Sequence, residues 1–191
     1  LAQNKSKADN FAKNVFNLLF IFLLLLVFLA EIFMPQLIYL IAPGFYKDPD
    51  KLNFAIKLSR ITFPFLFFIS LASFFSAILN SYNKFAAAAA IPIVLNIVLI
   101  GSLFISQLLN TSEAITLSYA VSFSGFLQLF ILYFFVRKKF KPFSDIKIKI
   151  NKKIKFFFKK LIPSIFSSGI TQINILVGTI IASFQAGAVS Y

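Results

Sequence analysis

Residues 61–83 read ITFPFLFFISLASFFSAILNSYN and carry no charged side chain. A helix needs about 20 mostly apolar residues to cross roughly 30 Å of hydrocarbon, so this stretch is long enough to span a membrane. Further stretches of that length and character lie on both sides of it. The expected membrane helices cover residues 15–42, 61–83, 85–112, 114–136 and 161–191. The sequence therefore predicts an all-α integral membrane protein, a polytopic helical bundle with five transmembrane helices.

The composition agrees with a membrane protein and removes most enzyme chemistry. Of the 191 residues, 59% are hydrophobic and 13% charged, whereas a soluble domain has about 25% charged residues. His and Cys are absent, which excludes histidine relays, thiol nucleophiles, disulfides and thiolate metal sites from this stretch. The six glycines form neither a P-loop nor a GxGxxG pattern. We therefore expect a protein that is not an enzyme, with no cofactor and no metal site.

The positive charges give the expected helices an orientation. Fifteen of the 19 Lys and Arg residues fall on the side that holds residues 1–14 and residues 137–160. Lys and Arg are enriched in cytoplasmic loops, so both segments are predicted to be cytoplasmic and residues 43–60 to form a periplasmic loop in which an amphipathic helix begins. The same asymmetry explains the net charge of +13, and nucleic acid is not an expected partner.

The basic segment at residues 137–160 has two interpretations. Ile and Lys alternate at residues 146–150, and lysines flank three consecutive phenylalanines at residues 152–160. A basic segment with apolar side chains can lie in the membrane interface and attract anionic lipid headgroups. An ordinary cytoplasmic loop with its usual excess of cations explains the same residues.

Two residues interrupt the first expected helix. Glu31 places a carboxylate in an otherwise apolar run, and Pro35 is expected to kink the helix because proline lacks a backbone N–H. Carboxylates in membrane helices are often functional, so Glu31 is a candidate proton or cation site. It can equally be a structural residue that is protonated or lies near the interface.

The last expected helix has a polar half. At about 100° per residue its hydrophilic side chains fall on one half of the circumference, with isoleucine, valine and phenylalanine on the other. The polar half consists of Ser164, Ser167, Ser168, Thr171, Gln172, Asn174, Thr179, Ser183 and Gln185. Polar groups lose free energy when they face hydrocarbon, so this half is expected to meet either an aqueous cavity or neighbouring helices.

Short motifs in a fixed order give the chain a family resemblance. They comprise Ala42-Pro43-Gly44-Phe45, Arg60-Ile61-Thr62-Phe63-Pro64, Ser70-Leu71, Ala77-Ile78-Leu79-Asn80-Ser81, Lys84-Phe85, Pro92, Leu95-Asn96, Gln128-Leu129, Thr171-Gln172-Ile173-Asn174, Thr179-Ile180-Ile181-Ala182-Ser183-Phe184 and Gly187-Ala188-Val189-Ser190-Tyr191. In this series the chain resembles the MurJ (MviN) lipid II flippase family of the multidrug/oligosaccharidyl-lipid/polysaccharide exporter superfamily. It departs from the family pattern at Ser76, Ala88 and Ser124, which affects kinks and packing.

The resemblance implies that the chain is a fragment covering about helices 3–7 of a fourteen-helix transporter. Such a transporter moves lipid II, an undecaprenyl-pyrophosphate-linked disaccharide-peptide, across the bacterial inner membrane by alternating access. The resemblance implies cavity-lining roles for Ser167, Thr171, Gln172, Asn174, Thr179 and Ser183. It also implies that the family's essential arginines lie outside these residues.

Two other functions remain open from the sequence. One is a related transporter, either another polysaccharide-lipid flippase or a cation-coupled drug antiporter. The other is a membrane scaffold subunit without transport activity, in which the polar half of the last helix would be a protein interface.

Overall fold

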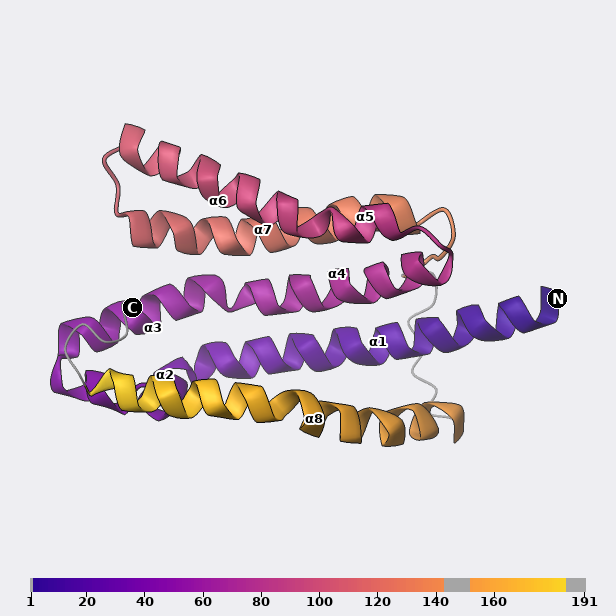
Figure 1. Cartoon of the computed structure of the whole chain (residues 1–191), viewed down its shortest axis with the longest axis horizontal. Helices are drawn as coiled ribbons and strands as arrows, with labels where there is room; N and C mark the ends of the chain where they lie inside the picture. Colours follow the sequence, from indigo (N-terminus) through magenta and orange to yellow (C-terminus); the bar gives the residue numbers. More distant parts are fainter. Residues whose placement is uncertain (1, 143–151, 185–191) are drawn as a thin grey trace. The chain divides into compact units, whose positions relative to one another are not determined.

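The structure is a computed structural model that describes residues 2–142 and 152–184, with side chains from Lys7 onward. Within these ranges the regular elements are all helical (Figure 1). They are α1 (Ala2–Ile32), α2 (Met34–Ile41), the 3₁₀ helix η1 (Pro43–Lys47), α3 (Pro49–Thr62), α4 (Pro64–Ser81), α5 (Phe85–Ala89), α6 (Ile91–Leu108), α7 (Glu113–Val136) and α8 (Lys152–Ser183).

Five helical stretches of the described chain are long and apolar enough to cross a membrane. They are Lys7–Ile32, Pro49–Ser81, Phe85–Leu108, Glu113–Val136 and Lys152–Ser183. The predicted fold class, an all-α polytopic bundle, is confirmed.

The first helical stretch differs from its expected bounds at both ends. α1 already begins at Ala2, inside the segment expected to precede the first membrane helix. It ends at Ile32, and α2 starts at Met34 with Pro35 in its first turn. A proline removes one helical hydrogen bond and its ring crowds the carbonyl four residues earlier, which favours a break at this point. Residues 15–42 therefore form two helices joined at Phe33.

Residues 43–60 contain more helix than expected. After η1, α3 starts at Pro49 because Asp48 caps it, and the Lys51 N–H donates to Asp48 Oδ1 at 3.1 Å. An aspartate before a proline at the first helical position is a favourable helix start. α3 then leads into α4, and the two together form one membrane-length stretch.

The last helix also begins earlier than expected. α8 starts at Lys152, inside the expected basic loop, so Pro163 lies within the helix rather than near its start. The Ile and Lys alternation at residues 146–150 and the final residues 185–191 lie outside the described residues.

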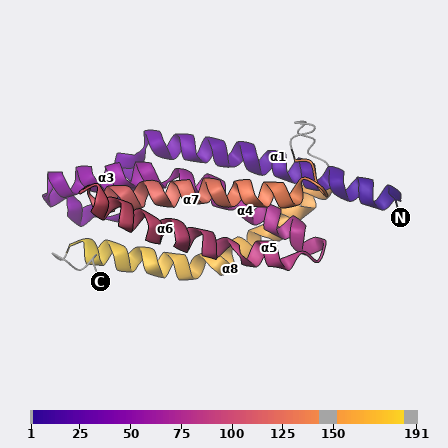
Figure 2. The ribbon, with the colours of Figure 1, turned by 90° about the horizontal axis from the view of Figure 1, so that it is seen from above.

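The described helices divide into two compact units. The first comprises residues 1–31 and 58–148, in which α1, α4 and α7 run lengthwise and α6 lies beside α7 (Figures 1 and 2). Its core is rich in phenylalanine, and the Phe16 and Phe75 rings stack with centroids 5.5 Å apart. The buried core consists of Phe16, Leu23, Leu71, Ala72, Phe75, Leu79, Ile91, Leu132, Val136 and Phe140.

Close packing of α4 against α7 depends on a glycine. A Cβ placed on Gly125 would lie 2.6 Å from the Phe65 ring and 3.2 Å from Phe68 Cβ. Small residues at such positions let membrane helices approach closely, where packing rather than a hydrophobic driving force holds them together. Ser122 of α7 adds a hydrogen bond from its hydroxyl to the carbonyl of Ile61, which lies at the end of α3 just before α4.

The second unit comprises residues 32–57 and 149–191. It contains α2, η1, most of α3 and the described part of α8. Contacts within it join α8 to α2 and to η1. This unit holds the polar half of α8 and the turn that meets the C-terminal end of this helix.

Candidate functional site

The polar half of α8 is open over most of its length. Ser167, Thr171, Gln172 and Asn174 are all exposed. Farther along, Thr179 is half-buried, and its hydroxyl donates to the carbonyl of Ile175 in the same helix at 2.9 Å. The hydroxyls and amides of the four exposed residues can therefore bind polar groups outside the helix.

An apolar side chain interrupts the polar half. Ile175 lies about 40° around the helix from Thr171, between hydroxyl-bearing neighbours, and is exposed. The opposite half carries exposed isoleucines such as Ile170 and Ile173. α8 thus presents one face suited to lipid or to apolar helices and another of mixed hydroxyl, amide and apolar groups.

Ser183 differs from the other expected cavity-lining residues. It is buried at the C-terminal end of α8, with 5% of its surface exposed. Its hydroxyl donates to the Ile180 carbonyl at 2.7 Å and accepts the Gly44 N–H at 3.0 Å. The structure therefore places Ser183 in a tertiary contact and separates it from the open group around Thr171.

The candidate carboxylate belongs to the first unit. Glu31 is half-buried, and its Oε1 atom is buried without a hydrogen-bond partner among the described residues. Arg60, near the end of α3, is the cation whose charge acts on it. Membrane proteins commonly tolerate a carboxylate within a membrane helix by setting an opposite charge near it. This arrangement suits either a structural pair or an ion-binding group.

α7 carries a buried polar series. Ser118, Ser124 and Gln128 are each at most 6% exposed. Both hydroxyls donate to carbonyls of their own helix, at 2.8 Å for Ser118 and 2.7 Å for Ser124. Gln128 Nε2 has no hydrogen-bond partner within the described part of the chain. A buried amide of this kind usually has a partner, so Gln128 is an exception among the buried polar residues of α7.

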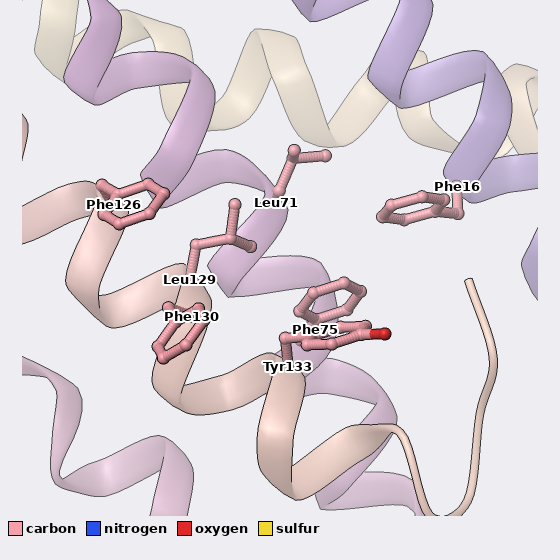
Figure 3. Close-up of a pocket in the computed structure, with 7 residues that line it drawn as sticks. All are labelled: Phe16, Leu71, Phe75, Phe126, Leu129, Phe130 and Tyr133. Carbon is pink, nitrogen blue, oxygen red and sulfur yellow. The ribbon is translucent and has the colours of Figure 1, made fainter. Parts of the chain in front are cut away.

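An apolar cavity of about 180 Å³ lies in the first unit (Figure 3). Its side chains come from α1, α4 and α7, and the Tyr133 hydroxyl is the polar atom that they contribute. The lining consists of Phe16, Leu71, Phe75, Phe126, Leu129, Phe130 and Tyr133. None of the polar residues expected to line a substrate cavity contributes to it. Apart from the Tyr133 hydroxyl, the lining is apolar and suits hydrocarbon rather than a charged or sugar-bearing group.

Sequence reasoning missed three of these features. It did not pair Arg60 with Glu31, although both stand where a helix approaches the predicted periplasmic side. It did not identify Gln128 as buried, although Ser118, Gly125 and Gln128 recur at helical spacing. It gave no reason to join Gly44 to Ser183, which are 139 residues apart.

Comparison with known proteins places these features in a family. The family described as "Lipid II flippase MurJ" matches the chain over residues 1–191. The chain belongs to the MurJ family. A "Probable lipid II flippase MurJ" of Rickettsia prowazekii (strain Madrid E) is 37% identical over 188 residues, which cover 98% of this chain and 37% of the relative. One of Rhizobium tropici is 36% identical over 187 residues, or 96% of this chain and 35% of the relative.

A solved MurJ structure has the same arrangement of helices. "Lipid II flippase MurJ, inward closed conformation" superposes with a TM-score of 0.80 at 28% sequence identity, over 97% of this chain and 38% of the solved chain. The resemblance to the MurJ family that the motif series predicted is confirmed. The chain spans little more than a third of the length of the MurJ relatives it matches.

Proposed function

We propose that the full-length protein containing this chain flips lipid II from the inner to the outer leaflet of the cytoplasmic membrane by alternating access. The observation that carries this proposal is the match to the MurJ family over residues 1–191. The relatives named lipid II flippases support it, as does the fold shared with MurJ in an inward closed conformation. The transported molecule would serve cell wall synthesis.

In this proposal α8 supplies a polar wall for the substrate. The exposed Thr171, Gln172 and Asn174 carry hydroxyl and amide groups suited to the sugars and the peptide of lipid II. The opposite, apolar half of the helix suits lipid or other helices. A lipid-linked substrate needs both a polar and an apolar surface. Its headgroup must find polar groups when it leaves water, while its polyprenyl tail stays in hydrocarbon.

The proposed location is the bacterial inner membrane, with the start of α1 on the cytoplasmic side. Support comes from the cation asymmetry, since the Lys and Arg residues concentrate before α1 crosses the membrane and between α7 and α8. With five candidate spans, this orientation would put the end of α8 on the periplasmic side.

We further propose that the start of α8 attracts anionic lipids. Lys152, Lys153 and Lys155 stand in and next to its first turn, which contains no acidic residue. The N-terminus of a helix is itself partly positive, so these lysines raise the local positive potential and favour a nearby anion. Lys160 lies 4.8 Å from the centroid of the Phe156 ring, which places a cation beside an apolar group of the kind found at membrane interfaces.

Complementation tests the proposed function. The essential lipid II flippase of a bacterium is depleted, and the full-length parent of this chain is expressed in its place. We expect growth with the native sequence and loss of growth with Thr171→Leu or Asn174→Leu, because each change replaces a polar group of the proposed wall by an apolar one. Ile173→Leu, on the opposite half of the same turn of α8, is the matched control and should grow.

The outcomes separate the proposal from its alternatives. A well-expressed, correctly inserted parent that gives no growth would argue against lipid II and for another exporter substrate. Growth of both leucine variants would remove Thr171 and Asn174 from the wall. Cys placed at these two positions would react with thiol reagents in some conformational states if they line a cavity, and in none if α8 serves a scaffold as a protein interface.

A further inference from the structure

Within the second unit, the C-terminal end of α8 meets η1 through very small groups. The Gly44 N–H donates to Ser183 Oγ at 3.0 Å, and the backbone of Ser183 and Phe184 lies directly against Gly44. Between Ile154 near its start and Ser183 at its end, α8 has no buried residue. Besides its contacts with α2, α8 is thus held within this unit by the Gly44–Ser183 contact, at the predicted periplasmic end of the helix.

This contact requires a glycine. A Cβ added to Gly44 would overlap the Ser183 carbonyl group and lie 2.6 Å from the Phe184 backbone nitrogen. The obstacle is backbone rather than the end of a flexible side chain, so it cannot move aside by changing a rotamer. Any larger residue at this position would force η1 and the end of α8 apart.

The hydrogen bonds at this contact permit reversible separation. Ser183 already donates its hydroxyl proton to the Ile180 carbonyl at 2.7 Å, inside its own helix, so that bond survives if Gly44 withdraws. Only the Gly44 N–H would lose its acceptor. Gly44 lies in the first turn of η1, where N–H groups have no acceptor within their own helix. Near the membrane surface water can replace the lost acceptor. Separation thus leaves neither the Gly44 N–H nor the Ser183 hydroxyl without a hydrogen-bond partner.

We propose that the Gly44–Ser183 contact is a periplasmic closure that separates and re-forms during each transport cycle. The inference rests on the proposed transport function, because alternating access requires some contact on that side to open. The solved MurJ structure with the matching fold is in an inward closed conformation. In alternating access the periplasmic side is closed in every inward conformation, so the contact would be formed in that state. Gly44 thereby positions the end of α8. The accessibility of position 183 to solvent then shows whether the closure is formed.

Thiol labelling in cells tests the closure directly. The full-length parent carries a single Cys in place of Ser183, a change of nearly equal size, and a membrane-impermeant maleimide is added from outside. Phe184→Cys, at an exposed neighbouring position, gives the rate of an open site. Ser106→Cys, at a position 1% exposed near the C-terminal end of α6, gives the rate of a permanently packed site.

We expect Ser183→Cys to react more slowly than Phe184→Cys and at least about tenfold faster than Ser106→Cys, because a minor open state of a few per cent exposes it repeatedly. Adding Gly44→Ala should raise its rate several-fold toward that of Phe184→Cys. Gly178→Ala is the matched control, since a Cβ at that position of α8 meets no atom within 4 Å, and it should leave the rate unchanged. A Ser183→Cys rate equal to that of Ser106→Cys, with or without Gly44→Ala, would show a permanent joint and overturn the proposal.

Growth in the depleted strain distinguishes this inference from the proposed function. A native parent that supports growth, together with a Gly44→Ala variant that supports it equally well, would overturn the closure alone. Absence of growth with the native parent, together with intermittent labelling of Ser183→Cys, would instead count against lipid II as substrate and support the closure. Immunoblots of membranes confirm that each variant is inserted at the native level.

Discussion

Replacement of Gly125 by alanine tests whether the α4–α7 interface is as close as the structure indicates. The new Cβ would lie 2.6 Å from the Phe65 ring, where ordinary contact begins at 3.4 Å, so the ring must retreat by about 0.8 Å. It would also lie 3.2 Å from Phe68 Cβ, which is fixed to the backbone and cannot rotate away. Overpacking of this kind costs about 1–3 kcal/mol.

Gly101→Ala in α6 provides the reference for this cost, because a Cβ at Gly101 meets nothing within 4 Å. Both substitutions gain the same helix propensity, about 1 kcal/mol in soluble helices, so their difference isolates the clash. Thermal denaturation of the purified full-length protein should therefore place Gly125→Ala below Gly101→Ala in stability. In a double-mutant cycle, Gly125→Ala should cost less in the Phe65→Ala background than in the native one, since the two residues are in contact. Equal midpoints for the two alanine variants would refute the close packing of α4 on α7.

Three further changes have defined outcomes in the same stability assay of the full-length protein. Ser122→Ala removes the hydrogen bond to the Ile61 carbonyl and should cost about 0.6 kcal/mol, the usual value for such bonds between membrane helices; no loss would show that the bond is not formed. Glu31→Ala and Arg60→Met should lose less stability together than the sum of their separate losses, because the Arg60 charge acts on Glu31; additive losses in a double-mutant cycle would show that the two charges are uncoupled. Gln128→Leu removes a buried amide with no described partner and should leave stability unchanged or raise it by about 1 kcal/mol; a marked loss would reveal a partner elsewhere in the full-length protein.

The five membrane-length helices could be predicted because length and apolar composition determine them locally. The charge-free run at residues 61–83 needs no tertiary information to be identified as a span, and α4 occupies most of it. The series of motifs predicted the family equally well, because the motifs and their order are properties of the sequence alone.

The helix boundaries were harder because single capping groups set them. Asp48 lies in the segment expected to be a periplasmic loop, but an aspartate followed by proline also starts helices, and in the structure it caps the start of α3. α8 begins at Lys152, far into a basic stretch whose charges favour the membrane surface without excluding helix. Local sequence supports both alternatives at each of these positions.

The contacts of the candidate site could not be predicted because they join distant residues. The polar half of α8 follows from periodicity, and its members Thr171 and Asn174 are exposed. Ser183 has the same chemistry and falls on the same half, yet it is buried by Gly44, which no local pattern associates with it. Gln128 is likewise polar in sequence and buried in the structure for reasons of packing between helices.

The long exposed run of α8 has a mechanical consequence. Ile154 and Ser183, the buried residues near its two ends, are separated by about 44 Å at a rise of 1.5 Å per residue. Over this length, a change of about 10° in the direction of the helix axis moves one end by about 8 Å relative to the other, which exceeds the reach of a hydrogen bond. A helix of this length therefore converts a small change in the direction of its axis into a displacement of molecular size at its far end.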